Sequence, residues 1–224
     1  MMITPYLHYC SDIPRLHFLT SLLTVPTGHD PEKEQLPMIV FLHGAGERGT
    51  DLDLVRRHGI PKHFGADPDY HGLRVITLSP QCPENQTWNH LIPELMDLIT
   101  AAARQYHADP DRISLTGLSM GGFGTWELGI SYPSFFSAMA PICGGGISGF
   151  ASVLANMPLR VYHGELDTVI PIMYSQMMVD AVRAAGGHPE FFTYPDIHHE
   201  AWVPAYDESD LIEWLAAQDR RQRI

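Results

Sequence analysis

Hydrophobic and polar positions along this chain follow two patterns, short continuous apolar runs and longer amphipathic segments. The run at 38–44, MIVFLHG, is apolar nearly throughout, which is typical of a strand buried on both faces of a sheet. Residues 90–106 instead place apolar side chains such as Leu95 and Ile99 at helical spacing. Because such strands and helices keep alternating, the pattern predicts a mainly parallel central sheet flanked by helices.

The same two patterns assign the other elements. Strands are predicted at 16–25 (one or two), 38–44, 73–80, 109–117, 136–145, 159–167 and 190–195. Helices are predicted at 90–106, 123–133, 173–187 and 207–218. Since no repeat, low-complexity tract or long linker interrupts this order, we expect one domain.

Composition and charge narrow the classes of protein to which the chain can belong. It has 224 residues, of which 45% are hydrophobic and 18% charged, as is typical of a soluble globular domain. The 14 basic and 26 acidic residues leave a net charge of −12. Because a surface of this sign repels nucleic acids and anionic membranes, neither is an expected partner. No apolar run approaches the length of a transmembrane helix.

The first twenty residues and the cysteines bear on the compartment and on metal binding. A signal peptide needs a basic region and an apolar region, and neither is clear in MMITPYLHYCSDIPRLHFLT, so we expect a cytoplasmic protein. The cysteines, Cys10, Cys82 and Cys143, follow no metal-binding or redox spacing. The 13 histidines include no pair with the spacing of a zinc-binding helix, so we expect no metal and no other cofactor.

A serine surrounded by glycines follows one of the predicted strands. Gly117, Ser119 and Gly121 form a Gly-x-Ser-x-Gly motif between the strand at 109–117 and the helix at 123–133. In a sharp strand-to-helix turn of this kind, the serine has a strained backbone and presents its hydroxyl above the sheet edge. The motif predicts a catalytic nucleophile; the alternative is a glycine-rich turn with an incidental serine.

A serine nucleophile needs a base and an acid, which in this type of site follow it in the order acid, then histidine. Asp167 lies in a turn after one predicted strand, and His198 and His199 lie in the loop after the last strand. These side chains would meet the serine at the carboxyl edge of a parallel sheet. The sequence leaves Glu165 and Asp196 open as alternative acids, and either histidine open as the base.

An acyl-transfer site also needs hydrogen-bond donors for the oxyanion. The glycine-rich segment FLHGAGERG at 41–49 follows a strand and makes the main-chain N–H of Ala45 one candidate. The other is the N–H of Met120, at the start of the helix after Ser119. We interpret three other histidines, His43, His63 and His163, as structural.

Together these motifs resemble the α/β-hydrolase superfamily. The segments that carry the resemblance are, in chain order, HGAGERG, GLSMGG, HGELDTVIP and HHEAW. The chain is most similar to small bacterial carboxylesterases related to feruloyl and polyhydroxybutyrate-depolymerase-type esterases, a group often labelled predicted peptidases. The resemblance implies that residues 1–224 form a single α/β-hydrolase domain, with a mainly parallel central sheet flanked by helices and no large lid.

The resemblance also implies roles for individual residues. Ser119 matches the nucleophile, Asp167 the acid and His199 the base. Ala45 and Met120 match the oxyanion donors by their main-chain N–H groups. One position departs from the family pattern, because a histidine precedes the base where glycine is usual.

The expected activity is that of a serine carboxylesterase acting on a small-molecule ester through an acyl-enzyme. Because no long insertion interrupts the strand–helix order, we expect an open site that favours short acyl chains. Trp88 and Trp202 are candidate walls of the substrate pocket, and packing in the core is the alternative for each. A serine peptidase of the prolyl-oligopeptidase type and a non-catalytic binding protein are alternative functions, and both a monomer and a homodimer stay open.

Overall fold

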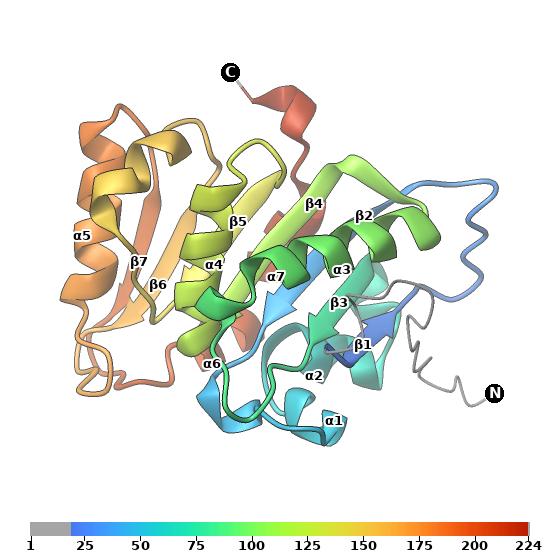
Figure 1. Cartoon of the computed structure of the whole chain (residues 1–224), viewed down its shortest axis with the longest axis horizontal. Coiled ribbons are helices and arrows are strands. Elements are labelled where there is room, and N and C mark those ends of the chain that lie inside the picture. The colour runs from blue at the N-terminus through green and yellow to red at the C-terminus, as the bar shows by residue number, and fades with distance from the viewer. Residues whose placement is uncertain (1–18, 224) are drawn as a thin grey trace.

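The computed structural model describes residues 19–223, whose seven strands form one sheet in the order β1-β3-β2-β4-β5-β6-β7 (Figure 1). β1 pairs with β3 in the antiparallel direction, and the other neighbouring strands pair in parallel. The predicted fold class, a mainly parallel sheet flanked by helices, is confirmed.

Helices alternate with these strands along the chain. The strands are β1 (Ser21–Thr24), β2 (Leu36–Leu42), β3 (Ile76–Pro80), β4 (Ala108–Leu118), β5 (Ala138–Ile142), β6 (Arg160–Gly164) and β7 (Glu190–Tyr194). The α-helices are α1 (Leu52–Val55), α2 (Gly59–Ala66), α3 (Ile92–Gln105), α4 (Met120–Ser131), α5 (Met173–Ala184), α6 (Trp202–Asp207) and α7 (Leu211–Ala217). Short 3-10 helices are η1 (Ala45–Glu47), η2 (Tyr70–Gly72), η3 (Trp88–His90), η4 (Ser148–Leu154) and η5 (Arg220–Gln222).

The hydrophobic core has two parts, one on each face of the sheet. Successive side chains of β2 alternate between them, because side chains of a strand point to opposite faces. Met38 and Val40 pack with residues of α3, α4 and α5. Ile39 and Phe41 pack with residues of α2, α6 and α7. Figure 1 shows α3 and α4 in front of the sheet and α7 behind it. Burial on both faces explains why this strand reads as one continuous apolar run.

The predicted elements match the described ones with a few differences. The structure contains α2, which we did not predict because Gly59, Pro61 and Gly65 are typical of turns. This helix is stabilised by the burial of Ile60 and Phe64 against the sheet. The short helix α6 was not predicted either. Of the first predicted strand, 21–24 is β1, and positions 16–18 lie outside the described residues.

The helices in the described part of the chain are short. The longest α-helix, α3, has 14 residues and includes charged side chains. A membrane-spanning helix needs about 20 mostly apolar residues. Between residues 19 and 223, no helix is long and apolar enough to cross a membrane.

The start of α4 lies in direct contact with the backbone at the ends of two strands. A methyl group at Gly121 would lie 1.9 Å from the carbonyl oxygen of Leu42, the last residue of β2. A methyl group at Gly122 would lie 2.4 Å from the carbonyl oxygen of Ile142, the last residue of β5. Real Cβ atoms do not come this close to backbone oxygens, so only glycine allows this packing.

His43 connects the end of β2 to two neighbouring segments. Its Nδ1 lies 2.6 Å from the Gly44 carbonyl oxygen, and its Nε2 accepts a hydrogen bond from the Cys82 N–H at 2.9 Å. Since Nε2 accepts, the proton is on Nδ1 and is donated to Gly44. Burial lowers the pKa of His43 to about 4, so the imidazole is neutral at pH 7. The histidine is structural, as expected, and it fixes the peptide that follows β2.

Trp88 does not form a pocket wall, and that prediction is wrong. The side chain is fully buried, and its indole N–H donates to the His43 carbonyl oxygen at 2.9 Å. Its ring packs edge-on against the His43 imidazole, with the ring centroids 4.9 Å apart. Burial removes a large apolar ring from water while its one polar atom keeps a partner, which favours the core over the surface.

We expect Gly121→Ala to lower the free energy of unfolding by about 2–3 kcal/mol, because an added methyl group must displace the end of β2. The matched control is Gly149→Ala, where a methyl group would meet no heavy atom within 4 Å. That control is expected to change stability by less than about 0.5 kcal/mol. Urea denaturation of both variants measures the difference, and equal stabilities would contradict the close packing of α4.

We expect the stability of the protein to fall as the pH drops from about 6.5 to about 4, in part because of His43. The unfolded chain takes up a proton on this side chain near the usual histidine value of about 6.5, whereas the folded state does so only near the lowered pKa of about 4. Between these values the unfolded state binds more protons, so the free energy of unfolding decreases as pH falls. In His43→Gln this loss should be smaller by up to about 1 kcal/mol per pH unit. Denaturation at several pH values tests this. If the free energy of unfolding has the same pH dependence in the wild type and in His43→Gln, folded His43 takes up its proton at the same pH as the unfolded chain, which contradicts the lowered pKa.

Candidate active site

Ser119 occupies a sharp turn between β4 and α4. Its backbone angles, φ 54° and ψ −116°, lie in a region that residues other than glycine rarely adopt. Its N–H donates to the Ile142 carbonyl oxygen at 2.9 Å, and its own carbonyl accepts from the Phe123 N–H at 3.1 Å. This strained turn places the serine at the carboxyl edge of the sheet, as the glycine-flanked motif predicts.

Ser119, His199 and Asp167 form a continuous chain of hydrogen bonds. The Oγ of Ser119 lies 2.9 Å from Nε2 of His199, and Nδ1 of His199 lies 2.7 Å from Oδ2 of Asp167. A carboxylate accepts, so Nδ1 carries the proton and Nε2 is free to accept from the serine hydroxyl. Asp167 lies in the loop between β6 and α5, and His199 in the loop between β7 and α6. Three separate loops at one edge of the sheet therefore supply the three side chains.

The Asp167 carboxylate is buried but surrounded by donors. Its Oδ1 accepts hydrogen bonds from the N–H groups of Val169 and Ile170, at 2.9 and 2.8 Å. Burial on its own raises the pKa of Asp167, but the hydrogen bonds from His199 and from the backbone of Ile170 and Val169 outweigh it and keep the pKa below its usual value. The carboxylate is therefore ionised at neutral pH, with a fixed orientation toward His199.

The alternative acids and the alternative base lie in other surroundings. Glu165 accepts a hydrogen bond from the Thr193 hydroxyl at 2.7 Å, and Asp196 is exposed. His198 is exposed, and its Nδ1 lies 2.9 Å from the Leu166 carbonyl oxygen. Of the two adjacent histidines, the structure thus brings His199 to the serine.

The two main-chain N–H groups expected as oxyanion donors belong to segments beside Ser119. Met120 is the first residue of α4, and the first four N–H groups of a helix have no partner within it. On the other side, a methyl group at Gly44 would lie 3.6 Å from Cβ of Ser119. His43 binds the Gly44 carbonyl oxygen, and in a trans peptide the following N–H, that of Ala45, points the opposite way.

The loop of Ala45 has a further contact that fixes it. The Arg48 guanidinium donates from Nε to the Ala45 carbonyl oxygen at 2.9 Å and from Nη1 to the Gln86 carbonyl oxygen at 3.4 Å. Glu47 is buried, and its main-chain carbonyl accepts from Gln81 at 2.8 Å. Glu47 and Arg48 thus hold the loop in place.

Trp202 lies beside the base. It is 9% exposed, and its indole meets the His199 ring edge-on, with the ring centroids 5.1 Å apart. The His58 ring lies on the same indole, at a centroid distance of 5.6 Å. Trp202 therefore restricts the orientation of the imidazole, and its place next to the site is consistent with the predicted pocket wall.

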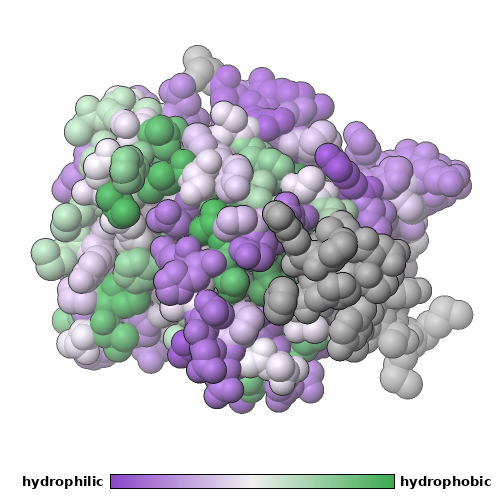
Figure 2. Space-filling view, in the orientation of Figure 1, coloured by the Kyte–Doolittle hydropathy of each residue, from purple (hydrophilic) through white to green (hydrophobic). Residues whose placement is uncertain are grey.

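Large apolar side chains are exposed beside the site. Leu166 and Val169 flank Asp167, and Val203 follows Trp202; each is at least 40% exposed. These three side chains form an exposed apolar rim, which offers contact to an uncharged, apolar group rather than to an anion. Other large apolar side chains exposed to this extent lie on or near η4 and α5, namely Ile147, Phe150, Val153, Met173, Tyr174 and Met177. Figure 2 shows such side chains gathered over the part of the molecule where η4 and α5 lie.

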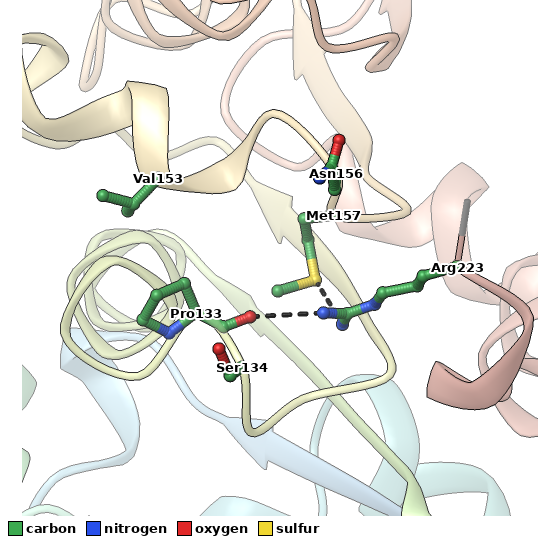
Figure 3. A pocket seen from close by; sticks show the side chains of 6 residues that line it. All are labelled: Pro133, Ser134, Val153, Asn156, Met157 and Arg223. Atoms are coloured by element: carbon green, nitrogen blue, oxygen red, sulfur yellow. Dashed lines mark hydrogen bonds between the residues drawn. The ribbon is translucent and has the colours of Figure 1, made fainter.

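Two surface cavities lie away from Ser119. One, of about 310 Å³, is lined by residues that follow α4, by residues at the end of η4 and after it, and by Arg223, which donates to the Pro133 carbonyl oxygen and to the sulfur of Met157 (Figure 3). The other, of about 380 Å³, includes Ala108, the first residue of β4. Because Ser119 lies at the opposite ends of β4 and α4, neither cavity adjoins it.

Three buried side chains near the site carry atoms that often bind metals. The ligand atoms of Cys143, His163 and Asp167 lie within 4.8 Å of one another, the one such group found within residues 19–223. Burial raises the pKa of the Cys143 thiol to about 12, so it keeps its proton, which it donates to the His199 carbonyl oxygen at 3.2 Å. A protonated thiol is a poor metal ligand, so these atoms suit hydrogen bonding better than ligation.

The sequence analysis did not associate His163 with the acid. His163 precedes Gly164, the last residue of β6, much as His43 precedes Gly44 just after β2. Nε2 of His163 lies 3.3 Å from Oδ2 of Asp167. The signal that could have pointed to it is the repeated His-Gly pair at the carboxyl end of a buried strand.

Comparisons with known proteins show likeness to esterases in sequence and in fold. No protein-family model matches the sequence. The chain is 30% identical over 157 residues to probable feruloyl esterase C of Aspergillus terreus, covering 67% of this chain and 56% of that protein. It is 26% identical over 170 residues to the poly(3-hydroxyoctanoate) depolymerase of Pseudomonas fluorescens, covering 66% of this chain and 60% of that protein.

A crystal structure of a thermostable esterase superposes with a TM-score of 0.80 at 33% sequence identity, covering 90% of this chain and 59% of that one. The chain spans about three fifths of the length of the curated relatives it matches. The likeness therefore concerns part of the length of those proteins. On the strength of this likeness in sequence and in fold, the chain belongs to the α/β-hydrolase superfamily.

Proposed function

We propose that this chain is a serine carboxylesterase that hydrolyses short-chain acyl esters through an acyl-enzyme. The observation that carries the proposal is the continuous hydrogen-bonded chain from Asp167 through His199 to the strained Ser119. Esterases among its relatives support the same reaction class. Each residue contributes a property that acyl transfer requires: a nucleophile, a base within hydrogen-bond distance, and an ionised group that orients the base.

In the first step the serine hydroxyl attacks the ester carbonyl carbon. Nε2 of His199 takes the hydroxyl proton as the Ser119 oxygen forms its bond to carbon, and the ionised Asp167 stabilises the resulting imidazolium. The oxyanion would accept hydrogen bonds from the N–H groups of Ala45 and Met120. Collapse of this intermediate breaks the bond to the alcohol, which leaves with the proton from His199.

In the second step a water molecule repeats the sequence. His199 takes a proton from water, the hydroxide attacks the acyl carbon, and the bond to Ser119 breaks as the proton returns to its oxygen. The acid product leaves and the enzyme is regenerated. Every proton in the cycle is transferred through Nε2 of His199.

An open site supports the preference for short acyl chains. The loops that carry the acid and the base run at 165–172 and 195–201 and contain no inserted helix. The exposed apolar rim around Asp167 and Trp202 offers contact on one side of a substrate but does not enclose it. A long acyl chain gains most from a closed apolar tunnel, whereas a short one loses little without it.

We expect fast hydrolysis of p-nitrophenyl acetate and butyrate, slower hydrolysis of the twelve-carbon ester, and loss of at least about 10⁴-fold in kcat in Ser119→Ala. The measurement is initial-rate hydrolysis across the chain-length series, with the wild type and the variant side by side. Faster cleavage of the long ester would contradict the open site. Absence of turnover on every ester would instead favour the peptidase or binding-protein alternatives.

We expect His199→Ala to lose at least about 10⁴-fold in kcat, because within residues 19–223 no other side chain forms a hydrogen bond with the Ser119 hydroxyl. The adjacent His198→Ala is the matched control, since that ring faces the Leu166 carbonyl oxygen and is exposed. It should keep most of the activity. Steady-state kinetics on a short ester decide between them, and the reverse pattern would assign the base to His198.

A further inference from the structure

We propose that His163 is a positioning residue, a second imidazole that lies against the Asp167 carboxylate and fixes the loop that aims this acid at His199. The inference rests on the proposed ester hydrolysis and adds a residue to its machinery. His163 lies in β6, directly before its final residue Gly164, and its side chain is fully buried, as is that of Asp167. It touches neither the nucleophile nor the substrate side of the site, so it acts through the acid.

The contacts of Nε2 show where the proton of His163 lies. This atom is 2.8 Å from the carbonyl oxygen of Ile170 and 3.3 Å from Oδ2 of Asp167. Both oxygens can only accept, so Nε2 carries a proton, which it donates to the Ile170 carbonyl oxygen and which lies beside Oδ2. The same Oδ2 accepts from Nδ1 of His199 at 2.7 Å. One carboxylate oxygen thus lies beside two imidazoles, with His199 at hydrogen-bond distance and His163 in a longer polar contact.

The other ring nitrogen lies beside a hydroxyl that is itself fixed. Nδ1 lies 2.8 Å from the hydroxyl oxygen of Ser175 in the first turn of α5. This hydroxyl donates its single proton to the Gly144 carbonyl oxygen, in the loop after β5, at 2.8 Å. Burial lowers the pKa of His163. The plane of the ring is therefore set by α5 and by the acid loop together.

Ile170 closes a ring of hydrogen bonds around the acid. Its N–H donates to Oδ1 of Asp167 at 2.8 Å, and its carbonyl accepts from Nε2 of His163, which lies 3.3 Å from Oδ2. The carboxylate is held through both oxygens, so rotation about its Cβ–Cγ bond would break several hydrogen bonds at once. A residue that merely filled the same volume would leave the Ile170 carbonyl and one side of Oδ2 without this donor.

The test compares two replacements of similar size that differ in one donor. His163→Leu fills the space without an N–H, whereas His163→Gln can place an amide N–H near the position of Nε2. We expect the leucine variant to lose about 10- to 100-fold in kcat on a short ester with KM nearly unchanged, because the acid is no longer aligned. The glutamine variant should recover most of this loss.

A spectroscopic readout tests the same inference without substrate. The proton shared by His199 and Asp167 should give a far-downfield ¹H NMR resonance in the wild type and in His163→Gln. In His163→Leu it should broaden or disappear. Because the resonance depends on the alignment of two side chains and not on turnover, it reports on positioning even where no ester is hydrolysed.

Stability measurements and a milder variant separate positioning from folding. Both His163 variants are expected to unfold more easily than the wild type, so the kinetic difference between them is the decisive quantity. If the leucine variant does not fold, Ser175→Ala removes the hydroxyl that sets the ring, and we expect it to lower kcat about three- to tenfold.

The outcomes are distinguishable from failure of the proposed function. If wild type and Ser119→Ala are equally inactive on esters, the proposed function is wrong, and the resonance alone decides the role of His163. If the wild type is active and His163→Leu has the same kcat and the same resonance, the inference is overturned. Equal losses of kcat in the leucine and glutamine variants would also overturn it, since they would trace the effect to packing.

Discussion

The close approach of α4 to the ends of β2 and β5 is the constraint on which the rest of the site depends. Parallel strands end at one edge of the sheet, and the helix after β4 must begin there. Cα hydrogens alone fit between this helix and the Leu42 and Ile142 carbonyls, and the chain reaches the helix through a turn with φ 54° at Ser119. Backbone packing thus places the nucleophile, and His199 and Asp167 are positioned relative to it.

Buried neutral histidines at strand ends stabilise the loops around that turn. His43 and His163 are each followed by a glycine near the carboxyl end of a strand, and burial lowers the pKa of both. A neutral imidazole donates from one nitrogen and accepts at the other, so it joins two polar groups without the cost of burying a charge. In contrast, Asp167 is buried as an ion, and the N–H groups around both of its oxygens offset that cost.

The sequence predicts the sheet, the longer helices and the order of the motifs, because these depend on periodicity and on local turn chemistry. It does not predict α2, because the glycines and proline of this segment favour a turn. The burial of Ile60 and Phe64 outweighs that local preference and stabilises the helix. The sequence also does not place Trp88, which lies in a polar stretch but packs in the core against His43. The contact of His163 with Asp167 also stays hidden, since it depends on how the loop after β6 folds back on its strand.

The site consists of two units of different origin, joined by His199. The acid unit is local, because Asp167 and Ile170 belong to one loop. This loop forms hydrogen bonds within itself and with His163 of the strand before it. The nucleophile unit depends on long-range packing of α4 against two strands. His199 comes from a third loop, where Trp202 packs against its ring and the Cys143 thiol donates to its carbonyl oxygen. Changes in that loop would therefore alter the alignment between two intact units. For this reason the contacts of Trp202 and Cys143 bear on the proposed reaction, although neither side chain takes part in the proposed proton transfer.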